Sequence, residues 1–182
     1  VSVIGENSPE WVYIDLGTMH AGGTTVGVYA TNSWEQCQYV VNHSESRFYF
    51  VENEEQLDKA LRFRANVPRL EKIIVWDLKG LKHFKDPMVM SFDEFLALGH
   101  ELDKKDPGLF EKTWKRVASQ DLARLIYTSG TTGPPKGAML THTNITWMAK
   151  AMAEGNPIQG GDEFLSFLPL CHIFEQLFTI FM

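Results

Sequence analysis

The sequence predicts an α/β fold in which a parallel sheet is covered by helices on both sides. Short apolar runs alternate with helical stretches along the 182 residues, which is typical of parallel strands joined by crossover helices. Several of these helical stretches begin with a recognisable capping residue. The composition, 44% hydrophobic and 22% charged, is ordinary for a globular domain.

The first part of the chain carries the clearest pattern. We expect strands, where β-branched and aromatic residues cluster, at residues 1–4, 25–29, 47–51 and 72–76. Ser8 is placed to cap the first helix, with Pro9 at its first position. Ser33 is placed to cap the second, with Gln36 as its capping-box partner. A charged helix is expected from about Glu54 to Arg64.

The pattern weakens from about residue 78 to residue 107 and then returns. Within the weak region, Ser91 opens an expected amphipathic helix, whose apolar side would carry Phe92, Phe95, Leu96 and Leu102. Beyond it we expect a strand over Arg124–Tyr127 and a helix over residues 143–154.

The end of the chain, residues 164–182, is apolar and long enough to raise the question of a membrane span. Pro169, His172, Glu175 and Gln176 lie within it and would be costly at the centre of a bilayer. We therefore expect a strand over residues 163–168, a turn and the start of a buried helix.

The segment from Tyr127 to Gly137 has the composition of a polyphosphate-binding loop. It reads YTSGTTGPPKG, which combines hydroxyls, glycines and one lysine in a short stretch. Glycines let backbone N–H groups turn toward an anion, hydroxyls add donors, and lysine adds a positive charge. The segment therefore points to phosphate chemistry.

Two known kinds of phosphate loop and a linker without function are the alternatives for this segment. A Walker-type loop ends in glycine, lysine and serine or threonine, whereas Pro135 precedes Lys136 here and Gly137 follows it. The kinase pattern G-x-G-x-x-G does not occur in the segment. A plain surface linker would not need a lysine directly behind two prolines.

Charge and cysteine content narrow the function classes. The net charge of −6, without a lysine or arginine stripe, argues against a nucleic-acid-binding protein. The two cysteines, Cys37 and Cys171, show neither a disulfide framework nor metal spacing, which suits a reducing compartment. Cys171 next to His172 is poorly arranged as a thiol nucleophile with its base, because adjacent residues of an extended segment point to opposite sides.

The loop sequence resembles the phosphate-binding signature of the adenylate-forming (AMP-binding) superfamily. The stretches Asn7–Trp11, Gly27–Ser33 and Phe167–Gln176 are similar to the long-chain and very-long-chain fatty acyl-CoA synthetase branch. Residues 144–147 are similar to its bubblegum-type members. The resemblance runs through nearly the whole chain and thins between residues 78 and 120.

The resemblance implies a reaction and a set of site residues. A long-chain fatty acid would be activated by ATP to acyl-AMP with release of pyrophosphate, and CoA would then form the thioester, with Mg²⁺ as the metal. Thr128 would lie near Mg²⁺, and His172 would act together with Lys136 in catalysis, beside the reacting carboxylate. Glu175 and Gln176 are further candidates for that pocket. The residues implied to line the phosphates are Thr128, Ser129, Gly130, Thr131, Thr132, Gly133 and Lys136. From the residues alone, a core histidine bonded to backbone is the favoured interpretation of His172.

The chain departs from the complete family pattern. We find no Tyr-Gly-x-Thr-Glu segment, no ribose-binding aspartate, no hinge and no C-terminal domain with its catalytic lysine. Both ends also look cut. The resemblance thus implies that residues 1–182 are a helix-covered, parallel-sheet portion of the large N-terminal AMP-binding domain, without the C-terminal domain and inactive alone.

Two alternative functions stay open at this point. One is another adenylate-forming ligase, acting on an aryl, amino or short-chain acid. The other is a non-catalytic module that binds nucleotide or lipid. We expect a cytoplasmic protein. Peripheral contact with a membrane stays open, because long-chain acyl substrates partition into bilayers. Acyl chain length, oligomeric state and regulation are not predicted.

Overall fold

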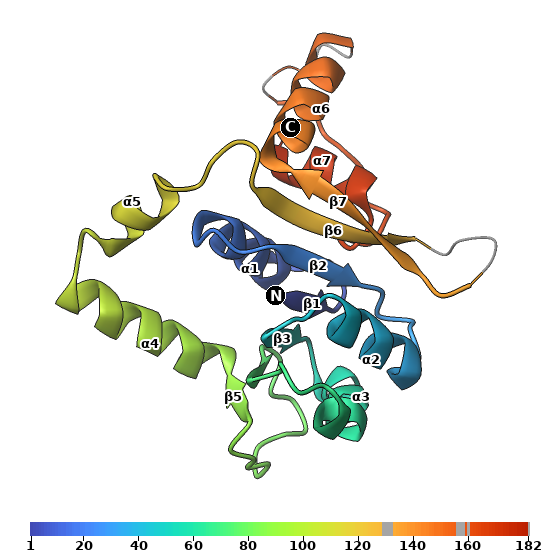
Figure 1. Cartoon of the computed structure of the whole chain (residues 1–182), viewed down its shortest axis with the longest axis vertical. Helices are drawn as coiled ribbons and strands as arrows, with labels where there is room; N and C mark the ends of the chain where they lie inside the picture. The colour runs from blue at the N-terminus through green and yellow to red at the C-terminus, as the bar shows by residue number, and fades with distance from the viewer. Residues whose placement is uncertain (129–132, 156–158, 160, 182) are drawn as a thin grey trace.

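The computed structural model describes residues 1–128, 133–155, 159 and 161–181, apart from the side chain of residue 181. Its centre is a seven-stranded sheet in the order β5-β4-β3-β1-β2-β6-β7 (Figure 1). The strands are β1 (Ser2–Ile4), β2 (Thr25–Val28), β3 (Phe48–Val51), β4 (Lys72–Val75), β5 (Val89–Ser91), β6 (Leu122–Thr128) and β7 (Lys136–Thr141).

The helices begin largely where the capping signals predict. Ser8 accepts a hydrogen bond from the Trp11 N–H at 3.3 Å, and Ser33 forms a capping box with Gln36. A second capping box, between Ser91 and Glu94, starts α4. The helices are α1 (Pro9–His20), α2 (Trp34–His43), α3 (Glu54–Phe63), the 3₁₀ turn η1 (Arg64–Asn66), α4 (Phe92–Lys105), α5 (Leu109–Trp114), α6 (His142–Gly155) and α7 (Ile173–Phe181).

The order of the strands explains why helices cover both faces. β1 pairs in parallel with β2 on one side and with β3 on the other, so the connection from β2 to β3 crosses over β1. Because such crossovers are right-handed, α1 lies on one face, whereas α2 and α3 lie on the other (Figure 1). The prediction of a helix-covered parallel sheet is confirmed for β1 to β6. β7 is antiparallel to β6.

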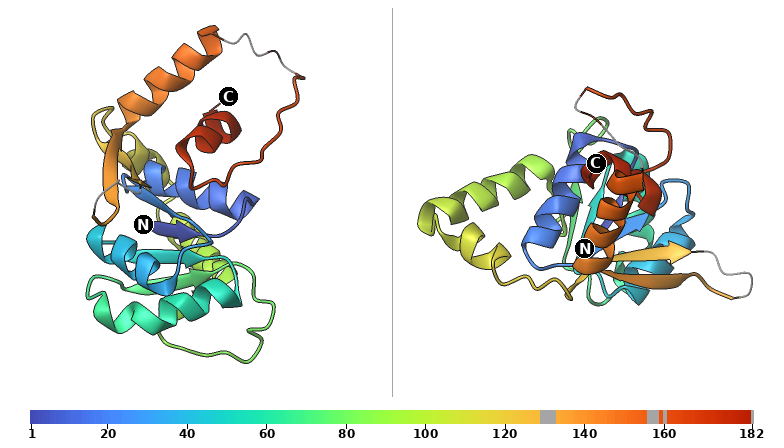
Figure 2. Two further views of the ribbon diagram at one scale, coloured as in Figure 1. Left: turned by 90° about the vertical axis from the view of Figure 1, so that its right-hand side faces the viewer. Right: turned by 90° about the horizontal axis from the view of Figure 1, so that it is seen from above.

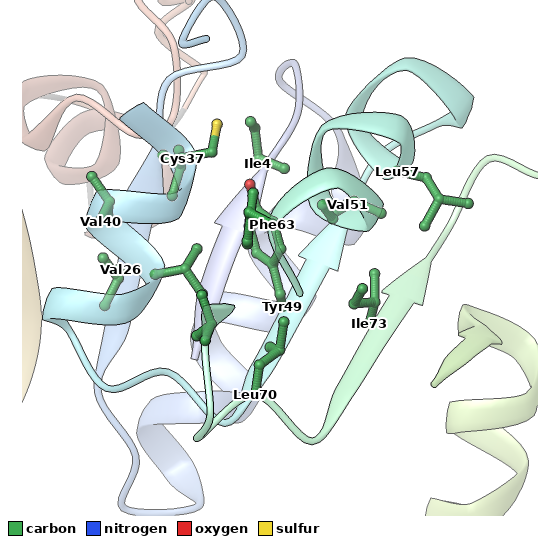
Figure 3. Close-up of a cluster of buried hydrophobic side chains, with 14 of the residues drawn as sticks. Ile4, Val26, Cys37, Val40, Tyr49, Val51, Leu57, Phe63, Leu70 and Ile73 are labelled. Atoms are coloured by element: carbon green, nitrogen blue, oxygen red, sulfur yellow. The ribbon is translucent and has the colours of Figure 1, made fainter. Parts of the chain in front are cut away.

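Each face of the sheet has its own core. Figure 3 shows the core under α2 and α3, where Tyr49 and Ile73 of the sheet meet Cys37 of α2 and Phe63 of α3. The core under α1 contains Val3, Trp11, Ile14, Phe50 and Ile74. Neighbouring strand residues thus alternate between two buried faces, which accounts for the continuous apolar runs in the sequence.

The strand expected over residues 163–168 is wrong. Residues 162–167 form neither strand nor helix, and Leu165 and Phe167 are largely exposed. The place beside β6 is taken by β7, which directly follows the glycine- and proline-rich loop. Asn7 donates instead to the Ser166 hydroxyl at 3.2 Å and to the Leu168 carbonyl at 2.8 Å, so this segment is held by side-chain contacts and not by pairing with a strand.

The weak region of the sequence and the residues directly after it contain regular structure that the pattern did not predict. β5 pairs with β4, and α5 follows α4. Phe92 and Phe95 of α4 contact Phe50 of the sheet edge-on, whereas Leu102 is 51% exposed, so only the first turns of α4 pack as expected. Figure 2 shows α6 and α7 close together at one end of the molecule and α4 standing out from its side.

No membrane-spanning helix is present in the described part of the chain, because none of its helices is both long enough and apolar enough.

Candidate active site

The hydroxyl- and glycine-rich segment connects the two strands of a β-hairpin. β6 ends at Thr128 and β7 begins at Lys136, and the antiparallel register pairs these two residues directly. Gly133, just before the second strand, has a φ of +90°, a conformation that favours glycine. Four of the predicted phosphate-binding residues lie outside the described part: Ser129, Gly130, Thr131 and Thr132.

Thr128 and Lys136 project from one face of the hairpin. Directly paired residues of antiparallel strands place their side chains on the same face. Tyr127, one residue earlier, packs against the core under α2, so Thr128 and Lys136 point to the opposite face, where α1 lies. Both side chains are exposed. Lys136 has no ion-pair partner among the described residues.

A buried ion pair fixes the strand that leads into the loop. Arg124 of β6 and Asp15 of α1 have side chains only 1% and 0% exposed. The Arg124 guanidinium donates from Nε to Asp15 Oδ1 at 3.2 Å and from Nη2 to Oδ2. Such a two-point contact sets orientation as well as distance. β6 is therefore attached to α1 on the same face from which Thr128 projects.

The segment before α7 crosses this face close to β2. The Cβ of a larger residue at Gly27 would lie 2.8 Å from the Cα of Cys171, so only glycine allows this approach. Asn7, after the end of β1, holds the same segment: its Nδ2 donates to the Leu168 carbonyl at 2.8 Å, and its Oδ1 accepts from the Leu170 N–H at 2.7 Å.

His172 lies at the start of α7 with a defined hydrogen bond. Its Nδ1 accepts from the Phe174 N–H at 3.2 Å, so the neutral ring carries its proton on Nε2. The side chain is half-buried. The Nε2–H is therefore the group that His172 can offer to an acceptor.

The pairing of strands brings His172 and the loop to the same edge of the sheet. Val26 of β2 is paired with Leu125 of β6, so continuing this parallel register places the end of β2 beside Thr128. The contact between Cys171 and Gly27 places the α7 segment over this part of β2. Thr128, Lys136 and the segment that carries His172 thus share one face and one edge of the sheet.

The remaining candidates near His172 have structural partners. Burial raises the pKa of the Cys171 thiol to about 12, so it stays protonated near neutral pH, and its rejection as a nucleophile agrees with this. Glu175 is fully buried and accepts from the Leu168 N–H at 3.2 Å. Gln176 is 1% exposed and donates to the Leu170 carbonyl at 2.5 Å. These two side chains hold the turn before α7 in place.

The described donors suit a nucleotide phosphate better than a metal held by protein alone. The described residues contain no group of three or more metal-binding side chains. They do offer the exposed side chains of Lys136 and Thr128 at the two ends of the loop. The Thr128 hydroxyl could supply one oxygen ligand to Mg²⁺, whose other ligands would be substrate phosphates and water.

Two features of the site were missed in the sequence. The sequence analysis assigned Asn7 no role of its own beyond its place in the stretch Asn7–Trp11. An amide side chain directly before a helix cap is a signal that could have indicated that it holds a loop. The pairing of Arg124 with Asp15 spans 109 residues and has a weaker signal, a single arginine inside an apolar strand.

Comparison with known proteins agrees with this geometry. The family model described as AMP-binding enzyme matches residues 1–182. The long-chain-fatty-acid–CoA ligase ACSBG2 of Xenopus laevis is 38% identical over 186 residues, covering 100% of this chain and 24% of that protein. ACSBG2 of Homo sapiens is 39% identical over 184 residues, covering 100% and 27%. The chain thus spans about a quarter of these curated relatives.

A solved structure with the same fold is the anthranilate CoA ligase AuaEII in complex with anthranoyl-AMP. It superimposes with a TM-score of 0.62 at 22% sequence identity and covers 82% of this chain and 26% of that chain. The likeness establishes the fold.

Proposed function

The chain belongs to the AMP-binding enzyme family, and from this premise we propose that it is part of a long-chain fatty acid–CoA ligase. Such an enzyme would use ATP to convert a fatty acid to acyl-AMP and pyrophosphate, and would then pass the acyl group to CoA. The names of the similar curated proteins support a long-chain substrate. Residues 1–182 would form part of the large N-terminal domain, with the C-terminal domain outside this chain.

The observation that carries the proposal is the direct pairing of Thr128 with Lys136. This pairing puts a hydroxyl and an ammonium side by side at the two ends of the loop, on the face crossed by the His172 segment. The loop can therefore hold a polyphosphate between its ends while the reacting carboxylate lies against α7. Ser129, Gly130, Thr131, Thr132 and Gly133 would add further donors.

The proposed chemistry needs positioning and charge neutralisation. The carboxylate of a fatty acid is already a nucleophile toward the α-phosphorus, so no catalytic serine or cysteine is required. Lys136 would neutralise charge on the departing pyrophosphate, and Thr128 would donate to a phosphate oxygen or bind Mg²⁺. His172 Nε2–H would donate to the carboxylate or an α-phosphate oxygen and hold the two in line. When bound, Mg²⁺ would add charge neutralisation.

A substrate panel with a histidine variant tests this proposal. In the complete polypeptide, acyl-AMP formation should be fastest with long-chain acids and slow with acetate, benzoate and amino acids. His172→Ala should raise the KM for the fatty acid and lower kcat by roughly 10- to 100-fold, as expected for one lost preorganised donor. His83→Ala, at an exposed position, is the matched control. Preference for an aryl or short acid would favour another adenylate-forming ligase. Nucleotide or lipid binding without acyl-AMP would favour a non-catalytic module.

We further propose that the complete enzyme works in the cytoplasm and contacts membrane surfaces peripherally. Its proposed substrates partition into bilayers, so collecting them would bring the enzyme to the lipid surface. Co-sedimentation of the complete polypeptide with vesicles that contain fatty acid tests this, and binding absent at all vesicle concentrations would contradict it.

A further inference from the structure

Helix α2 contacts the hairpin at both ends of the loop. The Tyr39 hydroxyl donates to the carbonyl of Pro135 at 2.9 Å, and Pro135 directly precedes Lys136. The Nδ1 of His43 and the hydroxyl of Tyr127 are hydrogen-bonded at 2.7 Å, and Tyr127 directly precedes Thr128. The first contact holds a backbone carbonyl and the second a side chain, and each lies one residue from a proposed phosphate-binding residue.

The three rings form a compact cluster. Tyr39 and His43 are stacked, with ring centroids 5.3 Å apart and planes 23° apart. The Tyr127 ring stands edge-on to both, at interplanar angles of 89° to Tyr39 and 84° to His43. Edge-to-face ring pairs add to the stability gained from burial. Two residues one turn apart on α2 thus bind a single tyrosine of β6.

Gly137 makes room for this cluster in the second strand. It is paired with Tyr127 across the hairpin, and a Cβ at this position would lie 3.2 Å from Cζ of the Tyr127 ring. The ring therefore lies across the backbone of β7. Burial raises the pKa of Tyr127 to about 12, so the phenol keeps its proton, and its bond to His43, at neutral pH.

The hairpin needs this support because of its place in the sheet. β7 is the last strand in the sheet order and pairs only with β6. Within the described part of the chain no strand lies beyond β7. The residues that bind the Pro135 carbonyl and the Tyr127 hydroxyl come from α2. The relative positions of Thr128 and Lys136 thus depend on both β6–β7 pairing and the contacts with α2.

Resting on the proposed function, we propose that Tyr39 and His43 are positioning residues for the triphosphate of ATP. They act from the opposite face of the sheet, through Tyr127 and Pro135, and do not touch the substrate. By holding both ends of the loop against α2, they keep the Thr128 hydroxyl and the Lys136 ammonium at the separation that the phosphates require. Their loss should therefore weaken ATP binding without changing the fatty-acid site.

Conservative variants of the complete polypeptide test this. Tyr39→Phe and Tyr127→Phe keep their rings and each remove one hydrogen bond, so the KM for ATP should rise by about 3- to 10-fold, the usual worth of one such bond. The KM for the fatty acid should stay within about 2-fold, since the lost bonds hold the ends of the loop, whereas Asn7 holds the segment that carries His172. Tyr13→Phe, at a 64% exposed tyrosine of α1, is the matched control and should match the wild type.

A double-variant cycle separates positioning from a general loss of stability. His43→Phe and Tyr127→Phe remove the same hydrogen bond, so the double variant should raise the KM for ATP no more than either single variant. Adding Tyr39→Phe should raise it further, because that variant removes a separate bond. If the His43→Phe and Tyr127→Phe variants raise the KM for ATP by factors that multiply in the double variant, the proposal is contradicted. It is also contradicted if the KM for ATP and the KM for the fatty acid rise together while the melting temperature falls.

The two proposals fail in distinguishable ways. If the wild-type complete polypeptide forms no acyl-AMP, the proposed function is wrong. If the wild type is active and the Tyr39→Phe and Tyr127→Phe variants bind ATP as tightly as it does, only the positioning role is wrong.

Discussion

Asp15 and Arg124 are the least exposed ion pair among the described residues, and they join α1 to the strand that leads into the loop. Replacing Asp15 takes the opposite charge away from a buried guanidinium. Asp15→Ala should therefore lower the free energy of unfolding by about 3–5 kcal/mol, measured by urea denaturation. Asp58→Ala, at an exposed position on α3, is the control and should change it by less than about 0.5 kcal/mol.

The outcome of a double replacement would identify the cause. Asp15→Leu combined with Arg124→Met removes both charges and keeps apolar volume, so most of the lost stability should return. If Asp15→Ala is as stable as Asp58→Ala, the ion pair does not hold β6 against α1.

Cys171 should make stability depend on pH in the alkaline range. Burial raises the pKa of its thiol in the folded protein to about 12, from an ordinary value of 9.0. Above pH 9 the unfolded chain loses this proton while the folded protein keeps it, so stability falls as pH rises from 9 toward 12. The slope for one such group is about 1.4 kcal/mol per pH unit.

Urea unfolding of the wild type and of Cys171→Ala between pH 8 and pH 11 measures this contribution. The advantage of the wild type over the variant should shrink as pH rises above 9, while other titrating groups affect both proteins alike. If the free energies of unfolding of the two proteins change with pH in parallel, burial does not raise the pKa of the Cys171 thiol.

At the scale of single residues, the sequence suggested candidates for the chemistry but not the contacts that support them. Thr128 and Lys136 are predicted to bind phosphate because hydroxyls, glycines and lysine lie close together in the chain, and this stays a prediction. The contacts of Asn7 and of the Asp15–Arg124 pair could not be predicted, because their partners are more than 100 residues away and the contacts exist only after the sheet has formed.

Among the elements, β2 closely approaches the segment before α7. A Cβ at Gly27 would lie 2.8 Å from the Cα of Cys171, which is backbone and cannot rotate away. Gly27→Ala should therefore push the His172 segment from the sheet and cost about 1–3 kcal/mol of stability. Gly99→Ala is the matched control: it lies within α4 with no atom within 4 Å of an added Cβ, so it should stabilise the helix by about 0.5–1 kcal/mol.

Two measurements read out this contrast. Urea denaturation gives the change in stability, and the fatty-acid KM of the complete polypeptide gives the displacement of His172. A Gly27→Ala variant with wild-type stability and KM would show that the segment does not rest on β2.

Elements with strong local signals were predictable from the sequence. The capping box of Ser33 with Gln36 and the β-branched runs of the central strands depend on neighbours in the chain. β5 has only three residues and β7 begins with lysine and glycine, so neither has a strong strand signal of its own. Both lie at an edge of the sheet, and their pairing depends on the neighbours that the fold provides. The strand predicted over residues 163–168 was wrong for a different reason. Their apolar content is high, but Asn7 holds the end of this segment by long-range hydrogen bonds that the local pattern does not show.

For the whole molecule, the central claim is that these residues supply the phosphate-binding and carboxylate-facing part of an adenylate-forming ligase. The described chain places Thr128 and Lys136 on one face and at the same edge as the His172 segment. The proposed domain organisation adds that residues 1–182 alone do not complete the site, so activity should require the complete polypeptide.

The most direct measurement is fatty-acid-dependent exchange of labelled pyrophosphate into ATP, because it reports adenylate formation without CoA. The wild-type complete polypeptide should exchange only when a long-chain acid is present, and Lys136→Ala should be slower by roughly 10- to 1000-fold. Lys150→Ala, at an exposed lysine of α6, should retain the wild-type rate, and residues 1–182 alone should not exchange. Wild-type exchange by Lys136→Ala, or strong exchange by residues 1–182 alone, would contradict the account.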